Sequence, residues 1–345
     1  MLHFQNDYSE GAHPRVLEAL QDVNLEPNTG YGKDAHCRAA ADRLRAVFAC
    51  PDADVHFLVG GTQTNLTAAA AFLQPWEAMI AADTGHVCVH ETGAIEATGH
   101  KVCAVPAVNG KVTPAAVRKL VAEHRTGVEE HMVLPKLLYV SDSTELGTIY
   151  CRKELEDLRD VCKELGLLLY LDGARLAAAL TAEGNDLKPE DFAQLCDAFY
   201  VGGTKNALLF GEALVIVNES LKPFVRNVIK QRGGMLAKGW LPGVQFEALF
   251  RDDLWLETAK HANEQAQKLV KGLSDLGVDF YIDSPTNQIF PIFTDAQVEK
   301  MRKFVAFDFI ARVDETHSAV RFVTSWATPE ENVDFLLLAI QRVLQ

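Results

Sequence analysis

The fold is constrained most by one short apolar run, Leu167–Leu171, which ends on Asp172. A strand that lacks polar alternation is buried on both faces, and such strands belong to parallel sheets covered by helices. Gly173 and Ala174 come next and turn the chain toward a helix. Because ligands bind at the carboxyl ends of strands in sheets of this kind, Asp172 is expected at a ligand-binding edge. Taken alone, an aspartate in this position is also a good helix N-cap.

Strands and helices alternate along much of the chain. Strands are expected at Val55–Val59, Ala78–Ala82, Lys101–Val105 and Lys136–Val140, and helices at Glu91–Thr98, Thr113–Glu123 and Arg152–Leu165. Alternation over roughly 180 residues predicts an α/β architecture with a parallel-rich sheet and helices on its faces.

Length and composition allow two domains. The chain has 345 residues, of which 48% are hydrophobic, so it can bury a substantial core. An amphipathic helix over Gln245–Leu276 is expected to lead from a large domain, residues 1–244, into a smaller α+β domain, residues 245–345. Residues 1–35 are mostly polar and irregular, and they are expected to form an N-terminal arm of the large domain.

The acidic composition argues against two classes of partner. A formal net charge of −14 and a pI of about 5.2 disfavour nucleic acid and anionic membrane surfaces as main partners. Seven scattered cysteines without a Cys-x-x-Cys pair indicate reduced thiols in a cytoplasmic protein. No signal peptide, transmembrane segment or metal site is predicted.

Lys205 and Glu212 are the only charged residues between Ala198 and Val217. An unpaired ammonium in apolar surroundings is costly, so the site either supplies a partner or lowers the lysine pKa. A lysine with a lowered pKa is a good amine nucleophile, and Schiff-base chemistry is its main use. The alternative is a lysine that extends from a strand end into solvent.

A second motif, Gly60-Gly61-Thr62, lies between a predicted strand and a predicted helix. Backbone N–H groups at a helix N-terminus, together with the Thr62 hydroxyl, suit a phosphate group. On its own the motif is also compatible with an ordinary helix cap.

Taken together, Asp172-Gly173-Ala174-Arg175 and Gly203-Thr204-Lys205-Asn206 resemble the motifs of pyridoxal-phosphate (PLP) enzymes of aminotransferase fold type I. More narrowly, the chain resembles the threonine aldolase and phenylserine aldolase group, from Asn6-Asp7 to Arg321–Thr324. The resemblance implies a large domain with a mostly parallel seven-stranded sheet and a small C-terminal domain. It also implies a PLP-dependent aldolase that cleaves β-hydroxy-α-amino acids to glycine and an aldehyde.

The same resemblance implies which residues hold the cofactor. Lys205 would carry PLP as an aldimine, and Asp172 would keep the pyridine nitrogen protonated. The remaining cofactor contacts are assigned to Gly61 and Thr62 for the phosphate, His86 for stacking on the ring, Arg175, and Lys230 or Arg232 for the phosphate. For His86 the alternative is a loop histidine bonded to backbone.

Substrate contacts are also assigned through the resemblance. Arg175 and Arg321 would orient the substrate, because a guanidinium binds a carboxylate bidentately. Tyr31 would enter from a neighbouring subunit of a homodimer or homotetramer, and Asn6 would lie near the substrate. The alternatives are an ordinary surface turn at Tyr31 and a surface arginine at Arg321.

The sequence departs from the commoner pattern of this group at two positions. Glu145 stands where many members have a histidine, and Asn6 stands where a serine is expected. Glu145 or His86 is the candidate base for the β-hydroxyl proton, and an arginine-paired loop carboxylate is the alternative for Glu145. The choice among threonine, allo-threonine and phenylserine stays open. So do β-elimination, transamination or racemisation on the same scaffold, and a non-catalytic PLP-binding regulator.

Overall fold

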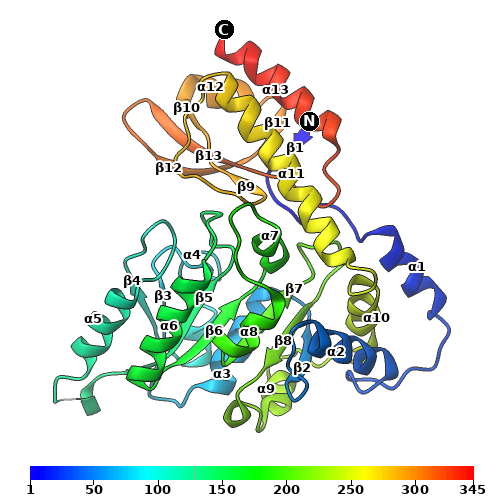
Figure 1. Ribbon diagram of the computed structural model, residues 1–345, viewed down its shortest axis with the longest axis vertical. Helices are drawn as coiled ribbons and strands as arrows, with labels where there is room; N and C mark the ends of the chain where they lie inside the picture. Colours follow the sequence, from blue (N-terminus) through cyan, green and yellow to red (C-terminus); the bar gives the residue numbers. More distant parts are fainter. Residues whose placement is uncertain (128) are drawn as a thin grey trace.

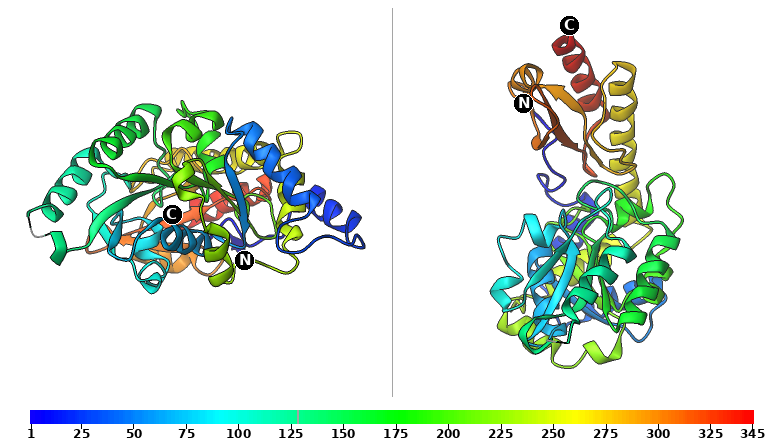
Figure 2. Two further views of the ribbon diagram at one scale, coloured as in Figure 1. Left: turned by 90° about the horizontal axis from the view of Figure 1, so that it is seen from below. Right: turned by 90° about the vertical axis from the view of Figure 1, so that its left-hand side faces the viewer.

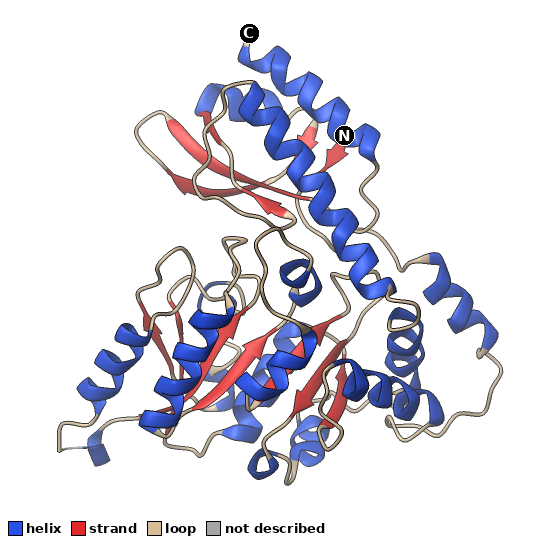
Figure 3. Ribbon diagram, in the orientation of Figure 1, coloured by secondary structure: helices blue, strands red, loops and turns tan. Residues whose placement is uncertain are grey.

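A seven-stranded mixed sheet forms the centre of the larger part of the protein (Figures 1 and 3). The computed structural model describes residues 1–127 and 129–345. The strand order is β2 (Asp54–Leu58), β8 (Glu212–Ile216), β7 (Ala198–Gly202), β6 (Leu168–Asp172), β5 (Leu134–Ser141), β3 (Glu77–Ala82) and β4 (Val102–Val105). Strands β3 to β7 pair in parallel, whereas β8 is antiparallel to both of its neighbours. The predicted fold class, with a mostly parallel seven-stranded sheet, is confirmed.

Helices cover both faces of this sheet because its central strands are apolar on both sides. In β5, Leu138 and Val140 belong to one buried cluster, whereas Leu137 and Tyr139 belong to another. The first cluster is closed by α2 (Ala35–Val47), α5 (Pro114–His124), α6 (Arg152–Leu165), α7 (Leu176–Leu180) and α8 (Pro189–Leu195). The second is closed by α3 (Gly61–Phe72), α4 (His86–Val89) and α9 (Val225–Gln231). Figure 2 shows these layers from two further directions.

The smaller part is built on an antiparallel sheet of β9 (Gln288–Ile289), β10 (Ile292–Thr294), β12 (Asp308–Arg312) and β13 (His317–Val323). Its own apolar cluster lies between this sheet and the helices α11 (Leu254–Asp275), α12 (Asp295–Met301) and α13 (Glu330–Leu344). Helix α11 extends from the large sheet into the smaller part (Figure 1). It therefore connects the two apolar cores.

The N-terminal arm crosses between these two parts. Strand β1 (Leu2–His3) pairs in parallel with β11 (Val305–Ala306) of the smaller part, and the arm then leads to α1 (Pro14–Asp22), which packs against α10 of the larger part. The predicted division at residue 244 stays a prediction, and it falls inside α10 (Trp240–Leu249). Short 3-10 helices complete the element set at Glu96–Thr98, Glu129–His131 and Glu219–Leu221.

Two predicted helices differ from the structure for a backbone reason. The expected long helix Gln245–Leu276 is divided into α10 and α11, because Asp252 and Asp253 both adopt φ of 55°, a left-handed conformation that no α-helix contains. The expected helix Glu91–Thr98 does not form, since Thr92 and Gly93 also have positive φ. Helix α4 begins at His86 instead.

The described part of the chain contains no helix long and apolar enough to cross a membrane. All seven cysteines are free thiols.

Candidate active site

A cavity of about 500 Å³ opens at the carboxyl ends of β6 and β7, between the large sheet and the smaller part. The residues that line it are Tyr8, Gly60, Gly61, Thr62, His86, His90, Glu145, Asp172, Ala174, Arg175, Tyr200, Thr204, Lys205, Glu212, Asp308 and Arg321. Eight of the residues singled out from the sequence are therefore in one place: Gly61, Thr62, His86, Glu145, Asp172, Arg175, Lys205 and Arg321. This edge of the sheet is where a parallel architecture places its ligands.

The carboxyl ends of β6 and β7 need glycine at two positions. A Cβ added to Gly202 would lie 2.3 Å from the carbonyl oxygen of Ala174, and one added to Gly173 would lie 2.0 Å from that of Tyr200. The Gly202 N–H donates to the Gly173 carbonyl at 2.9 Å. Because no side chain separates the ends of β6 and β7, the residues that follow each strand, including Lys205, are brought close to Asp172.

Asp172 is held by three hydrogen bonds and is almost completely buried. The Tyr139 hydroxyl donates to its Oδ2 at 2.6 Å, the Asn65 side-chain amide donates to Oδ2 at 3.0 Å, and the Ala174 N–H donates to Oδ1 at 3.0 Å. The last contact is the cap-like bond expected of an aspartate at this position. The other two hold the carboxylate in a fixed orientation at the edge of the cavity.

Lys205 forms no hydrogen bond or ion pair with any described residue. Burial lowers its pKa, and the positive charge of Arg175 lowers it further, against the opposing charges of Asp7, Glu145 and Asp172. A lowered pKa increases the fraction of neutral amine, which is the nucleophilic form. Of the two outcomes expected from the sequence, a partner or a lowered pKa, the structure has the second.

The N-terminus of α3 supplies an anion site beside the lysine. Gly61 and Thr62 are its first residues and line the cavity, and no described side chain caps the helix at Gly60. The N–H groups of a first helical turn have no partner within the helix, so they are left for a bound anion. A phosphate group fits this end of the cavity.

His86 stands at the start of α4 and contacts a buried carboxylate. Its Nδ1 lies 2.7 Å from Oε1 of Glu91. Burial lowers the pKa of His86, but the hydrogen bond to Glu91 and the charges of Glu145 and Asp172 outweigh burial, so the pKa is raised above its usual value. The expectation that His86 lies at the cofactor cavity is consistent with its position, and its stacking role stays a prediction.

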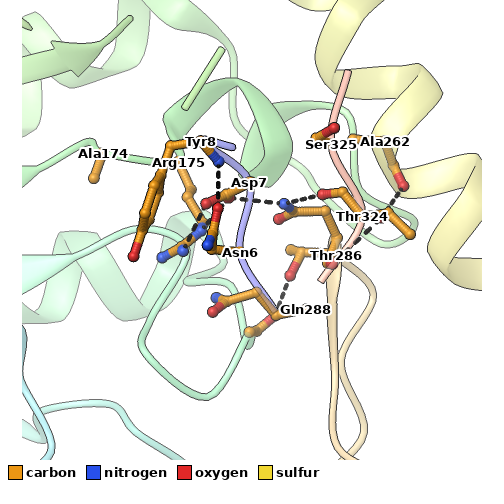
Figure 4. A network of polar contacts seen from close by, with 12 residues as sticks. Asn6, Asp7, Tyr8, Ala174, Arg175, Ala262, Thr286, Gln288, Thr324 and Ser325 are labelled. Carbon is orange, nitrogen blue, oxygen red and sulfur yellow. Dashed lines mark hydrogen bonds and ion pairs between the residues drawn. The ribbon is translucent and has the colours of Figure 1, made fainter. Parts of the chain in front are cut away.

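Arg175 is paired with a residue from the N-terminal arm. Its Nε and Nη2 donate to the two carboxylate oxygens of Asp7 at 2.7 and 3.1 Å, and both side chains are buried. Asn287 of the smaller part donates to the same Asp7 carboxylate at 2.9 Å. Figure 4 shows Asp7 next to Arg175, with Asn6 and Tyr8 beside them on the arm. One edge of the Arg175 guanidinium is thus occupied by the protein itself.

Arg321 and Glu145 complete the polar lining. Arg321 reaches the cavity from β13, where its Nη1 donates to Gln288 at 3.0 Å and its Nη2 to Asp308 at 2.6 Å. Its Nε is buried and has no partner among the described residues. A buried donor without a partner is costly, so an acceptor from a bound carboxylate would stabilise it. Glu145 reaches the cavity from the loop after β5.

Four predicted residues do not line this cavity within one chain. Asn6 accepts from the Tyr8 N–H and the Ser9 hydroxyl, so its side chain shapes the arm and places Tyr8 at the cavity. Tyr31 lines a different cavity and lies under Lys230, whose Nζ is 4.8 Å from its ring centroid. Arg232 lies at the end of α9. The roles assigned to Asn6, Tyr31, Lys230 and Arg232 stay predictions.

Sequence reasoning missed several residues that the fold brings to this region. Tyr8, His90, Glu212 and Asp308 line the cavity, and Asp7, Asn65 and Glu91 bind residues that line it. Burial raises the pKa of Glu212 to about 7. Most of these contacts join segments far apart in the chain, so no local sequence pattern predicts them. Glu212 is the exception, because it was visible as the second lone charge near Lys205.

These three features of the cavity fit the chemical groups of PLP. The helix N-terminus at Gly61 suits the phosphate, the Asp172 carboxylate suits the pyridine nitrogen, and the Lys205 amine suits the aldehyde. The fold and the site together define a PLP-dependent enzyme of fold type I. The beta-eliminating lyase family matches residues 7–296, and the chain belongs to that family. It is therefore a PLP-dependent lyase, as predicted.

The relatives agree with this placement. A threonine aldolase of Leishmania major is 45% identical to this chain over the full length of both, with a TM-score of 0.97. A low specificity L-threonine aldolase of Pseudomonas aeruginosa is 30% identical over 344 residues, 99% of this chain and 97% of the relative. An aspartate aminotransferase of Thermus thermophilus, 19% identical with a TM-score of 0.74 over 99% of this chain and 91% of its own, shares the fold. The predicted resemblance to threonine aldolases is confirmed.

Proposed function

We propose that this protein cleaves β-hydroxy-α-amino acids to glycine and an aldehyde, as a PLP-dependent aldolase. The observation that carries the proposal is the single cavity in which Lys205, Asp172 and Arg321 meet, in a chain 45% identical to a threonine aldolase. The substrate class is the one that the names of the relatives state.

Three groups of this chain would hold the cofactor. The N–H groups of Gly61 and Thr62 would bind its phosphate, Lys205 would bind its aldehyde carbon, and Asp172 would hold a proton on its pyridine nitrogen. PLP, when bound, supplies an electron sink for the pair of electrons released at the substrate Cα. The hydrogen bonds from Tyr139 and Asn65 keep the Asp172 carboxylate in place for this contact.

Arg321 is proposed to bind the substrate carboxylate. Its Nε is a buried donor without a partner among the described residues, and its two Nη atoms are fixed by Gln288 and Asp308. Arg175 is fixed in the same way by Asp7, which leaves its second edge for the substrate or the cofactor. Both guanidiniums are thus oriented before a ligand binds, which lowers the entropic cost of binding.

Glu145 is proposed as the base that takes the proton of the β-hydroxyl group. It lines the cavity on the loop after β5, and His86 is the second candidate in the same cavity. A homodimer or homotetramer with active sites shared between subunits, and a cytoplasmic location, belong to the same proposal. Tyr31 would then act in the cavity of the partner chain.

Product analysis tests the proposal. The purified, PLP-loaded protein is incubated with L-threonine, L-allo-threonine, L-phenylserine and D-threonine, and the products are separated by chromatography. Equal amounts of glycine and the matching aldehyde are expected from at least one substrate, and no product from the Lys205→Ala variant. Ammonia with a 2-oxo acid would indicate elimination, and an inverted amino acid would indicate racemisation; either result without glycine contradicts the aldolase assignment.

A further inference from the structure

Glu91 is a buried carboxylate with no role in the chemistry described so far. It follows α4, and its side chain has no exposed surface. Burying a carboxylate is costly unless hydrogen bonds compensate for the lost water. Its Oε1 accepts from His86 Nδ1 at 2.7 Å and from the Asn65 amide at 2.8 Å, whereas its Oε2 has no partner among the described residues. Among the described residues, the hydrogen bonds that compensate for the burial of Glu91 therefore come from His86 and Asn65.

Asn65 joins Glu91 to Asp172. Its side-chain amide nitrogen has two hydrogens, and it donates to Glu91 Oε1 at 2.8 Å and to Asp172 Oδ2 at 3.0 Å. Its Oδ1 accepts from the Tyr170 hydroxyl at 3.1 Å, and the whole residue is buried. Because an amide group is rigid, the two carboxylates are held at a fixed separation.

We propose that Glu91 is a positioning residue of the active site, which orients the His86 ring through Nδ1 and places a negative charge against it, while Asn65 couples this pair to Asp172. The role assigned to the pair, at the ring of the cofactor, rests on the proposed function; the His86–Glu91 contact itself does not. The contact at Nδ1 leaves Nε2 as the ring nitrogen that can face the cavity.

The charges around His86 favour this arrangement. Glu91, Glu145 and Asp172 are the carboxylates that act on it, and Lys205 is the opposing cation. His90 is a further titratable neighbour, with its ring centroid 5.5 Å from that of His86. Among the interactions that raise the pKa of His86, the hydrogen bond to Glu91 is the largest. Only Glu91 among these acids contacts the ring directly.

A Glu91→Gln substitution distinguishes the effect of the Glu91 charge on His86 from the effect of the volume of its side chain. Glutamine keeps the size of the side chain and an acceptor for Asn65, but it removes the negative charge. Glu96→Gln is the matched control, because Glu96 is an exposed glutamate in the same segment. Both variants lose one negative charge, and only the first loses the carboxylate that His86 contacts.

The test is an NMR titration of the PLP-loaded enzyme labelled with isotopic histidine, with the His86 signal assigned from a His86→Gln variant. The proposal expects the titration midpoint of His86 to fall by about one unit or more in Glu91→Gln, as the loss of an adjacent opposite charge does, and to stay unchanged in Glu96→Gln. A fall of the same size in both variants, or in neither, overturns the proposal.

The unmodified enzyme supplies a second test that needs no substitution at Glu91. His86 is expected to titrate above the ordinary value of about 6.5, and a midpoint below that value overturns the proposal. Because the readout is a titration and not turnover, it stays valid if the product analysis shows another reaction. A failure of the proposed function is therefore distinguishable from a failure of this inference.

Discussion

Glu145 occupies one of the two positions at which this chain departs from the commoner pattern, and its proposed role is to accept one proton. It lines the cavity with Lys205 and Arg321, and so it can reach a substrate hydroxyl directly or through a water molecule. His86 lies in the same cavity, with one ring nitrogen already engaged by Glu91. The two candidates come from different elements of the fold, so single substitutions can separate them.

Glu145→Gln is expected to lower the cleavage rate by at least about 100-fold, the usual value of general acid–base catalysis. Exchange of the glycine α-proton, which requires no hydroxyl deprotonation, should survive, as should PLP binding. Both rates are measured on the same preparation, the first by aldehyde release and the second by NMR in deuterated water. Equal loss of the two would mean that Glu145 supports the cofactor or the fold, and loss of neither would assign the proton to His86 or to water.

The residues that the sequence revealed are those whose surroundings are unusual along the chain. Lys205 and Asp172 were visible because each is a charge next to an apolar strand, and a buried charge needs a reason. The pairing of Arg175 with Asp7 was not visible, because the two are 168 residues apart. Tyr8 and Asp308 were missed for the same reason: they reach the cavity only after the arm and the smaller part have docked.

At the scale of elements, the N-terminal arm ties the smaller part to the active site. Its strand β1 pairs with β11, the Val323 N–H donates to the Phe4 carbonyl at 2.7 Å, and Asp7 then binds Arg175 and Asn287. The pKa of Asp7 is lowered to about 2; burial raises it, but the charges of Arg175 and Lys205 and the hydrogen bonds outweigh burial. The carboxylate is therefore charged at neutral pH.

Asp7→Ala is expected to destabilise the protein by about 3–5 kcal/mol, because it leaves the Arg175 guanidinium buried without its partner. Urea unfolding followed by circular dichroism measures the change. Asp295→Ala is the matched control, since it removes the partner of Arg312 in an exposed pair with similarly short contacts, and its effect should be much smaller. Equal losses in the two variants would contradict the account of the arm.

The loop after β5 contains a buried aspartate, Asp142. Burial affects its pKa in the opposite direction to the shift at Asp7. Burial raises its pKa to about 7, although its carboxylate accepts the Tyr150 N–H at 3.3 Å. In the unfolded chain the same group ionises near 3.8. Between these two values the native state binds more protons than the unfolded state, so stability falls as the pH rises through this window.

Asp142→Asn is expected to remove this pH-dependent loss. Relative to the unmodified protein, the variant should gain stability on going from pH 4 to pH 8, by about 4 kcal/mol for a shift of roughly three pKa units. The free energy of urea unfolding, measured for both proteins at each pH, gives the difference. A constant difference between the two proteins across this range would show that Asp142 ionises normally in the folded state.

Helix boundaries show where sequence periodicity stops being informative. The apolar pattern continues from α10 into α11, so it predicts one helix. The backbone dihedral angle φ, however, is positive at Asp252 and Asp253, and the helix is interrupted there. Side-chain periodicity records which face is buried and carries no signal for such a turn. By contrast, α6 was predicted with its observed ends, since Gly166 stops it in the left-handed conformation that glycine adopts freely.

At the scale of the whole molecule, the sequence was sufficient for the fold class, because buried parallel strands alternate with amphipathic helices over most of the large domain. The sequence alone was not sufficient to predict where Tyr31 lies in the fold. This residue is 46% exposed, and within one chain it lines a different cavity from the one that Lys205 lines. A shared active site in an oligomer would account for both facts.

A complementation experiment tests that arrangement. Tyr31→Ala and Lys205→Ala chains, each inactive alone, are mixed under conditions that exchange subunits. Heterodimers should regain part of the activity, because one of the two sites then has an intact Lys205 and an intact Tyr31. Exchange is verified by native mass spectrometry, and confirmed exchange without recovered activity would exclude Tyr31 from the neighbouring site. Mixing the Lys205→Ala chain with an Asp172→Ala chain is the control that should stay inactive.

The central claim is that Lys205 is the residue to which PLP binds covalently. This lysine is buried in the same cavity as Asp172 and has no hydrogen-bond or ion-pair partner in the part of the chain that the structure describes. Reduction of the PLP-loaded enzyme with borohydride, followed by proteolysis and mass spectrometry, tests this claim directly. The account predicts a stable pyridoxyl mass on the peptide that contains Lys205, and none anywhere in the Lys205→Ala variant. A pyridoxyl group on another lysine, such as Lys230, or one that persists in the variant, would contradict it.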